Sequence, residues 1–263
     1  MEKWKGAEKR PISRTVLVSS FHLFTLAILG LLLPLSLLLL ARLSNAPQLL
    51  PFIPHPSLPF TIISFLVDFH PPLLHILISS ICLLALLHAL TGRDIRPSIL
   101  VSWTALWVLQ FCVGTAVEAT IFAGVWPVVA GEGRLTWDQR ALFFIGLHET
   151  TLFWSRTVVR PLVDDTVYGE SREETAAQRV VMGAAFGVVW WWRLKDEVEI
   201  LGLVVEEKAK VGMAIDVTDF VCLSLYYITL GMGAVRIVKG MVWLLKLCIV
   251  RETAQCIDNG DKV

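Results

Sequence analysis

The chain has 263 residues, of which 55% are hydrophobic and 17% are charged, and its mean hydropathy is +0.66. Soluble globular proteins have about 45–50% apolar and about 25% charged residues, so this composition excludes an ordinary soluble domain and predicts a membrane protein. The 23 basic and 23 acidic residues cancel, which excludes the basic footprint of a nucleic-acid-binding protein.

The hydrophobic residues are concentrated in runs long enough to cross a bilayer, which predicts an all-α, polytopic membrane helix bundle. We expect about six transmembrane helices within residues 16–235, and a five-helix alternative stays open. A basic lead, residues 1–15, precedes this bundle, and a basic tail, residues 236–263, follows it.

The first predicted span, residues 16–41, contains Pro34, which a membrane helix tolerates with a kink. Its apolar run is longer than that of a cleavable signal peptide (about 7–15 residues), so we interpret it as an uncleaved signal anchor. Residues 43–72 hold seven of the 12 prolines, and this density predicts a Pro-rich loop. Within that loop, residues 60–67 are apolar but too short to span, which favours a re-entrant or interfacial segment.

The remaining predicted spans are residues 73–90, 98–122, 141–159, 180–192 and 217–235. The fifth span of the six, residues 180–192, covers only about 20 Å as a helix, and this shortness is why five spans stay open. It carries Gly183 and Gly187, a small-xxx-small pair typical of close helix packing. We expect the fourth span to lead through Arg160 and Pro161 into an acidic turn at Asp164 and Asp165.

The distribution of lysine and arginine predicts that both termini are cytoplasmic. With six spans, fifteen of the 23 basic residues lie in segments on the same side as the N-terminus and seven lie in segments on the other side. The remaining one, Arg156, lies within a span. The segment 193–216 opposes this bias, because its four basic residues fall on the outer side. The predicted location is an integral membrane of the secretory pathway or the plasma membrane.

The most informative stretch is residues 141–169, because it carries ionisable side chains inside an apolar run. A carboxylate or an imidazole at that depth costs several kcal/mol unless it has a partner or water. On an ideal helix Glu149, Arg156 and Arg160 lie within about 40° of one another. Arg156 and Arg160 are therefore candidates for structural ion pairs that fix the register of the helix.

A second hypothesis is a polar cavity that opens to the outer side. In the six-span topology, polar side chains from several spans lie near that side, and they are candidates for binding a substrate or an ion. These candidates are Glu118, His148, Glu149, Arg193 and Asp219.

The motifs of common enzyme classes do not support a catalytic site. Residues 148–150 read His-Glu-Thr, like the start of the zinc-protease pattern HExxH, but Leu152 stands where the second histidine is needed. No GxSxG elbow, phosphate loop or dinucleotide fingerprint occurs. We therefore predict no catalytic residue, no metal and no cofactor.

Residues 148–169, HETTLFWSRTVVRPLVDDTVYG, resemble a stretch of plant multi-pass transmembrane proteins whose function is unassigned. The resemblance implies an integral membrane protein and transfers no activity and no site residue to this chain.

Three functional classes are compatible with these observations. The favoured one is a non-enzymatic scaffold or regulatory membrane protein, whose partners are the lipid bilayer and other membrane proteins. The alternative is a small transporter or channel that uses Glu118, His148 and Glu149. A membrane-embedded enzyme is the third class. The sequence predicts neither the substrate nor the oligomeric state.

Overall fold

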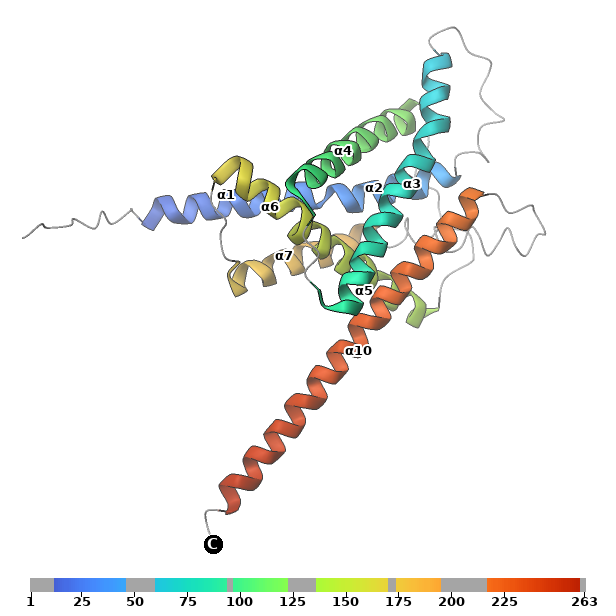
Figure 1. The fold of residues 1–263 in the computed structure, drawn as a ribbon. Helices are drawn as coiled ribbons and strands as arrows, with labels where there is room; N and C mark the ends of the chain where they lie inside the picture. The colour runs from blue at the N-terminus through green and yellow to red at the C-terminus, as the bar shows by residue number, and fades with distance from the viewer. Residues whose placement is uncertain are drawn as a thin grey trace, which may run out of the picture.

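The computed structural model describes the backbone of residues 12–45, 60–93, 97–122, 136–169, 174–194 and 217–260, and side chains over somewhat narrower ranges. The elements within these ranges are all helices, as the sequence predicts. Most of the helices cross one another in a bundle, and one long helix extends far from it (Figure 1). Most of the basic lead 1–15, nearly all of the segment 193–216 and the side chains after residue 251 lie outside the described residues.

The first predicted span is formed by α1 (Ile12–Gly30) and α2 (Leu32–Asn45), which are separated only by Leu31. The separation lies three residues before Pro34. Proline has no N–H to donate and its ring clashes with a carbonyl of the preceding turn, so a proline interrupts a helix about one turn before itself. The helix thus tolerates Pro34, as expected, with an interruption of one residue at Leu31.

The helix α3 (Phe60–Thr91) is longer than the sequence predicts. The prediction of a Pro-rich loop over residues 43–72 was wrong from Phe60 onward, because α3 passes through Pro71 and Pro72; residues 46–59 lie outside the described residues. Each proline removes one backbone hydrogen bond and bends a helix, but a long membrane helix tolerates the loss when the bonds on both sides remain. Figure 1 shows the two ends of α3 running in different directions.

The centre of the bundle is a continuous helical rod from Trp137 to Tyr168. It consists of α5 (Trp137–Trp154), the π-helical segment η3 (Ser155–Val159), α6 (Arg160–Val163) and a second π-helical segment, η4 (Asp164–Tyr168). The backbone angles are right-handed helical at each junction, so the direction of the chain is maintained through all four elements.

The π-helical segment η3 explains how the rod passes Pro161. The N–H of Arg160 donates to the carbonyl of Ser155, five residues back, instead of four. This wider turn makes room for the ring of Pro161, which in an ideal α-helix would clash with the carbonyl of Thr157. The acidic turn expected at Asp164 and Asp165 is therefore wrong: the rod continues to Gly169, whose φ of 65° ends it.

Two further helices and α4 (Ile99–Phe122) complete the bundle. The helix α7 (Ala176–Val188) continues into the π-helical segment η5 (Val189–Leu194) and packs against α5. The helix α4 packs against α2 and α3. The helix α10 (Val217–Gly260) has 44 residues and packs against α5 and α3 along its first half. The tail predicted after residue 236 is thus helical to Gly260.

The helices α5 and α10 approach each other closely at two glycines. A Cβ added at Gly146 would lie 1.9 Å from the carbonyl oxygen of Thr229, and one added at Gly233 would lie 2.0 Å from that of Leu142. Only glycine permits this approach. The close packing predicted for Gly183 and Gly187 is not found at Gly183, where an added Cβ meets nothing within 4 Å, and at Gly187 an added Cβ would lie 3.9 Å from Nε2 of His148, an ordinary contact.

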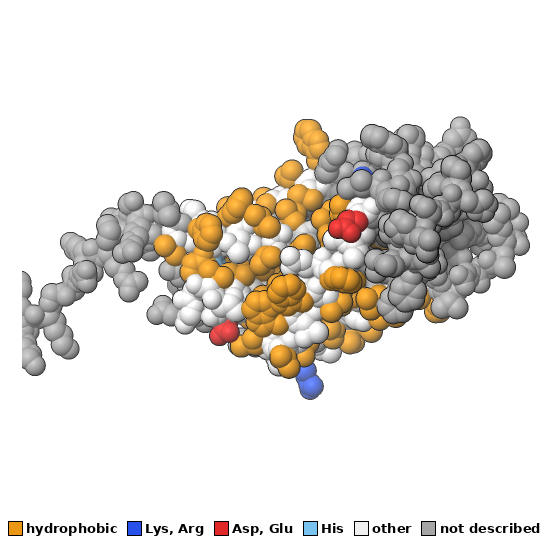
Figure 2. Space-filling view, turned by 90° about the horizontal axis from the view of Figure 1, so that it is seen from above, with side chains coloured by type: hydrophobic (Ala, Val, Ile, Leu, Met, Phe, Trp, Pro, Cys, Tyr) orange, Lys and Arg blue, Asp and Glu red, His pale blue; other side chains and the backbone are white. Residues whose placement is uncertain are grey.

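The buried core contains large aromatic side chains from the rod and from α7 and η5, including Trp154, Phe143, Phe186 and Trp190. Much of the outer surface is also hydrophobic, and Figure 2 shows one face on which hydrophobic side chains predominate and charged side chains are few. A large exposed apolar surface is typical of a protein whose solvent is lipid.

Four helical stretches are long and apolar enough to cross a membrane, by length and composition: Val18–Arg42, Leu73–Thr91, Ile99–Glu118 and Phe220–Arg251. They coincide with the first, second, third and sixth predicted spans. The fourth and fifth predicted spans, which correspond to α5 and α7, are not among these four.

Candidate functional site

The two central polar residues of the rod, His148 and Glu149, have partners on different helices. The imidazole Nε2 of His148 lies 2.9 Å from the carbonyl oxygen of Gly183 on α7. The carboxylate of Glu149 lies 2.8 Å from Nε of Arg236 on α10. Because the two side chains are adjacent on a helix, they point about 100° apart. The rod is thereby held to α7 on one side and to α10 on the other.

The structure does not bring the described members of the predicted cavity together. Glu118 is exposed near the end of α4, and Figure 1 shows that end of α4 directed away from α5. The backbones of Arg193 and Asp219 lie in η5 and α10, but their side chains lie outside the described residues. Among the described candidates, only His148 and Glu149 are therefore close to each other.

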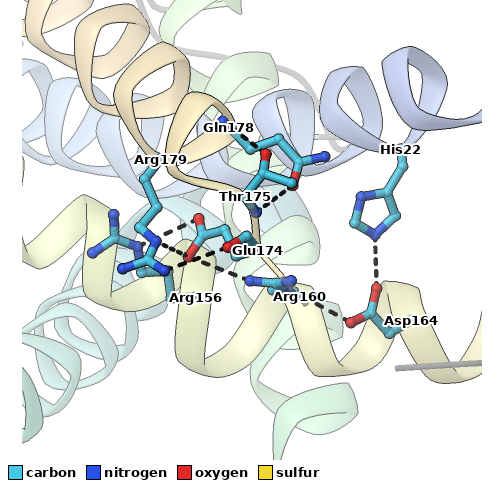
Figure 3. Close-up of polar contacts among 8 residues, drawn as sticks. All are labelled: His22, Arg156, Arg160, Asp164, Glu174, Thr175, Gln178 and Arg179. Carbon is cyan, nitrogen blue, oxygen red and sulfur yellow. Dashed lines mark hydrogen bonds and ion pairs between the residues drawn. The ribbon is translucent and has the colours of Figure 1, made fainter. Parts of the chain in front are cut away.

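A second polar cluster, which sequence reasoning missed as a unit, lies toward the C-terminal end of the rod (Figure 3). Its centre is Glu174, which precedes α7. The carboxylate of Glu174 lies 3.8 Å from Arg156, 3.3 Å from Arg160 and 3.6 Å from Arg179. We call this group of four residues the Glu174 cluster. It joins the rod to the start of α7.

The Glu174 cluster continues into the core through Asp164. One carboxylate oxygen of Asp164 lies 3.6 Å from Arg160, and the other lies 2.7 Å from Nε2 of His22 on α1. The side chains of His22 and Asp164 are only 4% and 7% exposed, and the ring of Tyr168 packs edge-on against His22 with a centroid distance of 4.9 Å. A buried carboxylate without partners is costly, and Asp164 has partners on both oxygens.

Local sequence places Glu174 where the three arginines can reach it. Thr175 is the N-cap of α7: its hydroxyl accepts from the N–H of Gln178, and the Gln178 side chain accepts from the N–H of Thr175. This reciprocal capping box fixes the start of α7. The Gln178 amide also donates to the hydroxyl of Ser19 at 3.2 Å, which joins α7 to α1.

Signals for this cluster were present in the sequence but were ambiguous. Arg160 and Asp164 are four residues apart, the spacing at which opposite charges pair on a helix. Recognising that pair required the helix to continue past Pro161, which the sequence argued against. His22 lies inside an apolar run, but its partner is 142 residues away in the chain, and no local spacing indicates such a contact.

The core of the bundle also contains hydroxyl groups, and they form hydrogen bonds within the protein. The buried hydroxyls of Thr150, Thr151 and Thr229 each donate to a carbonyl four residues back. The indole N–H of Trp190 donates to the hydroxyl of Thr151 at 3.1 Å. These contacts satisfy polar groups in the core and leave them committed to helix packing.

The charged side chains around Glu149 and around Glu174 form ion pairs that join helices. The pair formed by His22 and Asp164 has the composition of an acid–base pair, but its burial separates it from any dissolved substrate. Over the described residues, no three His, Cys, Asp or Glu side chains gather in a way that could hold a metal ion. No protein-family model, curated protein or solved structure matches the chain.

Proposed function

We propose that the chain is a multi-pass integral membrane protein with a non-enzymatic scaffold or regulatory role. The observation that carries the proposal is the use of the ionisable side chains. Glu149 is paired with Arg236, and Asp164 is paired with both His22 and Arg160. Each pair joins two helices or stabilises a junction, which favours a structural role for these charges over a substrate site. The resemblance of residues 148–169 to plant multi-pass proteins agrees with this proposal.

The proposed topology has six spans and cytoplasmic termini, and three contacts support it. Ser19 bonds to Gln178, His22 pairs with Asp164, and Lys239 donates to the carbonyl of Ala89. Each contact joins one residue of a segment that the distribution of basic residues assigns to the cytoplasmic side, Gln178, Asp164 or Lys239, to a residue near the cytoplasmic end of a predicted span. The close approach of Gly233 to Leu142 runs against this topology, because it joins the outer end of the fourth predicted span to the inner half of the sixth.

A transporter or channel is the second candidate, and one observation favours it. The rod that carries His148 and Glu149 is interrupted by a π-helical segment directly after α5. Such segments occur frequently at functional sites. In this second proposal the pair between Glu149 and Arg236 would open during transport.

Substitution of Glu149 separates the two candidates. Wild type and Glu149→Gln would be purified from native membranes in nanodiscs, analysed by mass spectrometry for bound proteins and small molecules, and reconstituted for flux measurements. A scaffold predicts a stoichiometric protein partner that both forms retain. A small molecule that is lost, or a flux that falls, only in Glu149→Gln would refute the scaffold and favour transport. The exposed Glu118→Gln is the matched control.

A further inference from the structure

Residues 236–251, in the second half of α10, present an exposed surface. From Arg236 to Arg251 every residue is exposed, and the apolar side chains among them include Trp243, which is 61% exposed, and Val250, which is 64% exposed. Figure 1 shows this half of α10 extending alone from the bundle. Such an apolar surface on a single helix indicates a docking surface.

A contact with α3 and the length of the apolar stretch together indicate where α10 leaves the membrane. The Nζ of Lys239 donates to the carbonyl of Ala89, which lies two residues before the end of the apolar stretch Leu73–Thr91 in α3. The apolar stretch of α10 has 32 residues, or about 48 Å of helix, whereas the hydrocarbon core is about 30 Å thick. Residues 220–239 span about 30 Å, so both arguments place the boundary near Lys239. About 18 Å of apolar helix, residues 240–251, lies beyond it.

Residues 236–251, which include the last turn before that boundary as well as the projecting residues 240–251, distribute their side chains unevenly around the helix. At 100° per residue, one arc of about 160° is entirely apolar. Its members are Ile237, Val238, Met241, Val242, Leu244, Leu245, Cys248 and Ile249. The opposite arc carries all four basic residues, Arg236, Lys239, Lys246 and Arg251, together with Trp243. An apolar arc opposite basic side chains and a tryptophan is the pattern of a helix lying at a membrane surface.

We propose that residues 240–251 of α10 lie along the surface of the same bilayer and bind its anionic phospholipid headgroups. Gly240 directly follows the boundary at Lys239 and has low helix propensity, so the helix can bend there. The apolar arc then enters the headgroup region, and Lys246 and Arg251 reach the phosphates. Charge favours lipid over a second copy of the chain, because residues 220–251 contain no acidic side chain to pair with the basic arc of another copy.

Depth measurements at two neighbouring positions test this proposal in the full-length protein. Cys248 is exposed and lies in the apolar arc, whereas Val250 lies about 160° away on the basic side. Cys82, Cys112 and Cys222 are buried, so a Cys256→Ser form would accept a fluorophore at Cys248. A Val250→Cys, Cys248→Ser form of the same protein would accept it at position 250. Both would be placed in nanodiscs of phosphatidylcholine with or without phosphatidylserine, and lipids with quenchers at known depths would be added.

In discs with phosphatidylserine we expect quenching of the probe at 248 by shallow quenchers, and much weaker quenching at 250. Each basic side chain near an anionic surface contributes about fivefold to the docked population, so Lys246→Gln with Arg251→Gln reduces the ratio of docked to undocked helix about 25-fold. Arg93→Gln, which removes a charge from the same side of the membrane but outside α10, is the control and leaves the ratio unchanged.

Two results would overturn the proposal. Probes at 248 and 250 that both escape quenching in discs with phosphatidylserine would place the helix in water or against a protein. Probes that are both quenched by deep quenchers would place the segment in the hydrocarbon core as a straight continuation of the span. The proposal requires the chain to be membrane-embedded but not to be a scaffold, and loss of flux in Glu149→Gln would refute only the scaffold.

Discussion

The crossing of α5 and α10 gives a prediction in which two nearby glycines behave oppositely. A Cβ at Gly233 would lie 2.0 Å from the carbonyl oxygen of Leu142, whereas a Cβ at Gly231 meets nothing within 4 Å. The clashing atom at Gly233 belongs to the backbone of a central helix and cannot move as a side-chain end can. The two helices must therefore separate by more than about 1 Å to restore van der Waals contact.

We expect Gly233→Ala to lower the free energy of unfolding by about 3 kcal/mol, the upper end of the usual cost of overpacking. Gly231→Ala should raise it by roughly 0.5–1 kcal/mol, because alanine has the higher helix propensity. Thermal unfolding of the purified protein in detergent, followed by reactivity of the buried cysteines, measures both. If the two variants unfold at the same temperature, α5 and α10 do not approach each other as closely at Gly233 as the structure indicates.

Three further predictions concern the polar groups, and thermal unfolding measures each of them. Asp164→Ala should destabilise the protein by about 3 kcal/mol, because it leaves His22 without its buried partner and removes one of the carboxylates beside Arg160. The exposed neighbour Asp165→Ala should have little effect, and equal effects of the two substitutions would contradict the assigned partners. Glu149→Gln should cost less than about 1 kcal/mol, since Arg236 is 60% exposed, and a larger loss would mean that the pair is more buried. Thr175→Ala should lower the free energy of unfolding by about 1 kcal/mol, because α7 loses its N-cap. Thr166→Ala, which removes a hydroxyl within the rod, is the control. An unchanged unfolding temperature of Thr175→Ala would argue against the capping box.

The parts of the fold that the sequence predicts correctly are those that depend on length and hydrophobicity. An apolar run of bilayer length has few alternatives to a helix, so the stretches around residues 18–42, 73–91 and 99–118 follow directly from composition. The interruption near Pro34 follows equally directly from the missing N–H.

Proline also caused the two main errors. The rule that proline ends a helix predicts a loop before Leu73 and a turn after Arg160, yet α3 and the rod continue through Pro71, Pro72 and Pro161. At Pro161 a π-helical turn removes the clash, and a sequence pattern does not show whether the backbone will widen in this way.

The partners of the polar residues could not be predicted because they depend on which helices are neighbours. Glu149 and Arg156 share a face on an ideal helix, but Glu149 pairs with α10 and Arg156 pairs with Glu174. Contacts between residues far apart in the chain are set by tertiary packing, which the spacing of residues within one helix does not determine.

The most direct test of the central proposal, a multi-pass bundle with cytoplasmic termini, is labelling of single cysteines in sealed vesicles with a membrane-impermeant reagent. Thr91→Cys and Val167→Cys are exposed positions on the proposed cytoplasmic side, and Glu118→Cys and Trp137→Cys are exposed positions on the proposed outer side. The proposal predicts that the first two react only from one side of the membrane and the last two only from the other. Reaction of all four from the same side would contradict it.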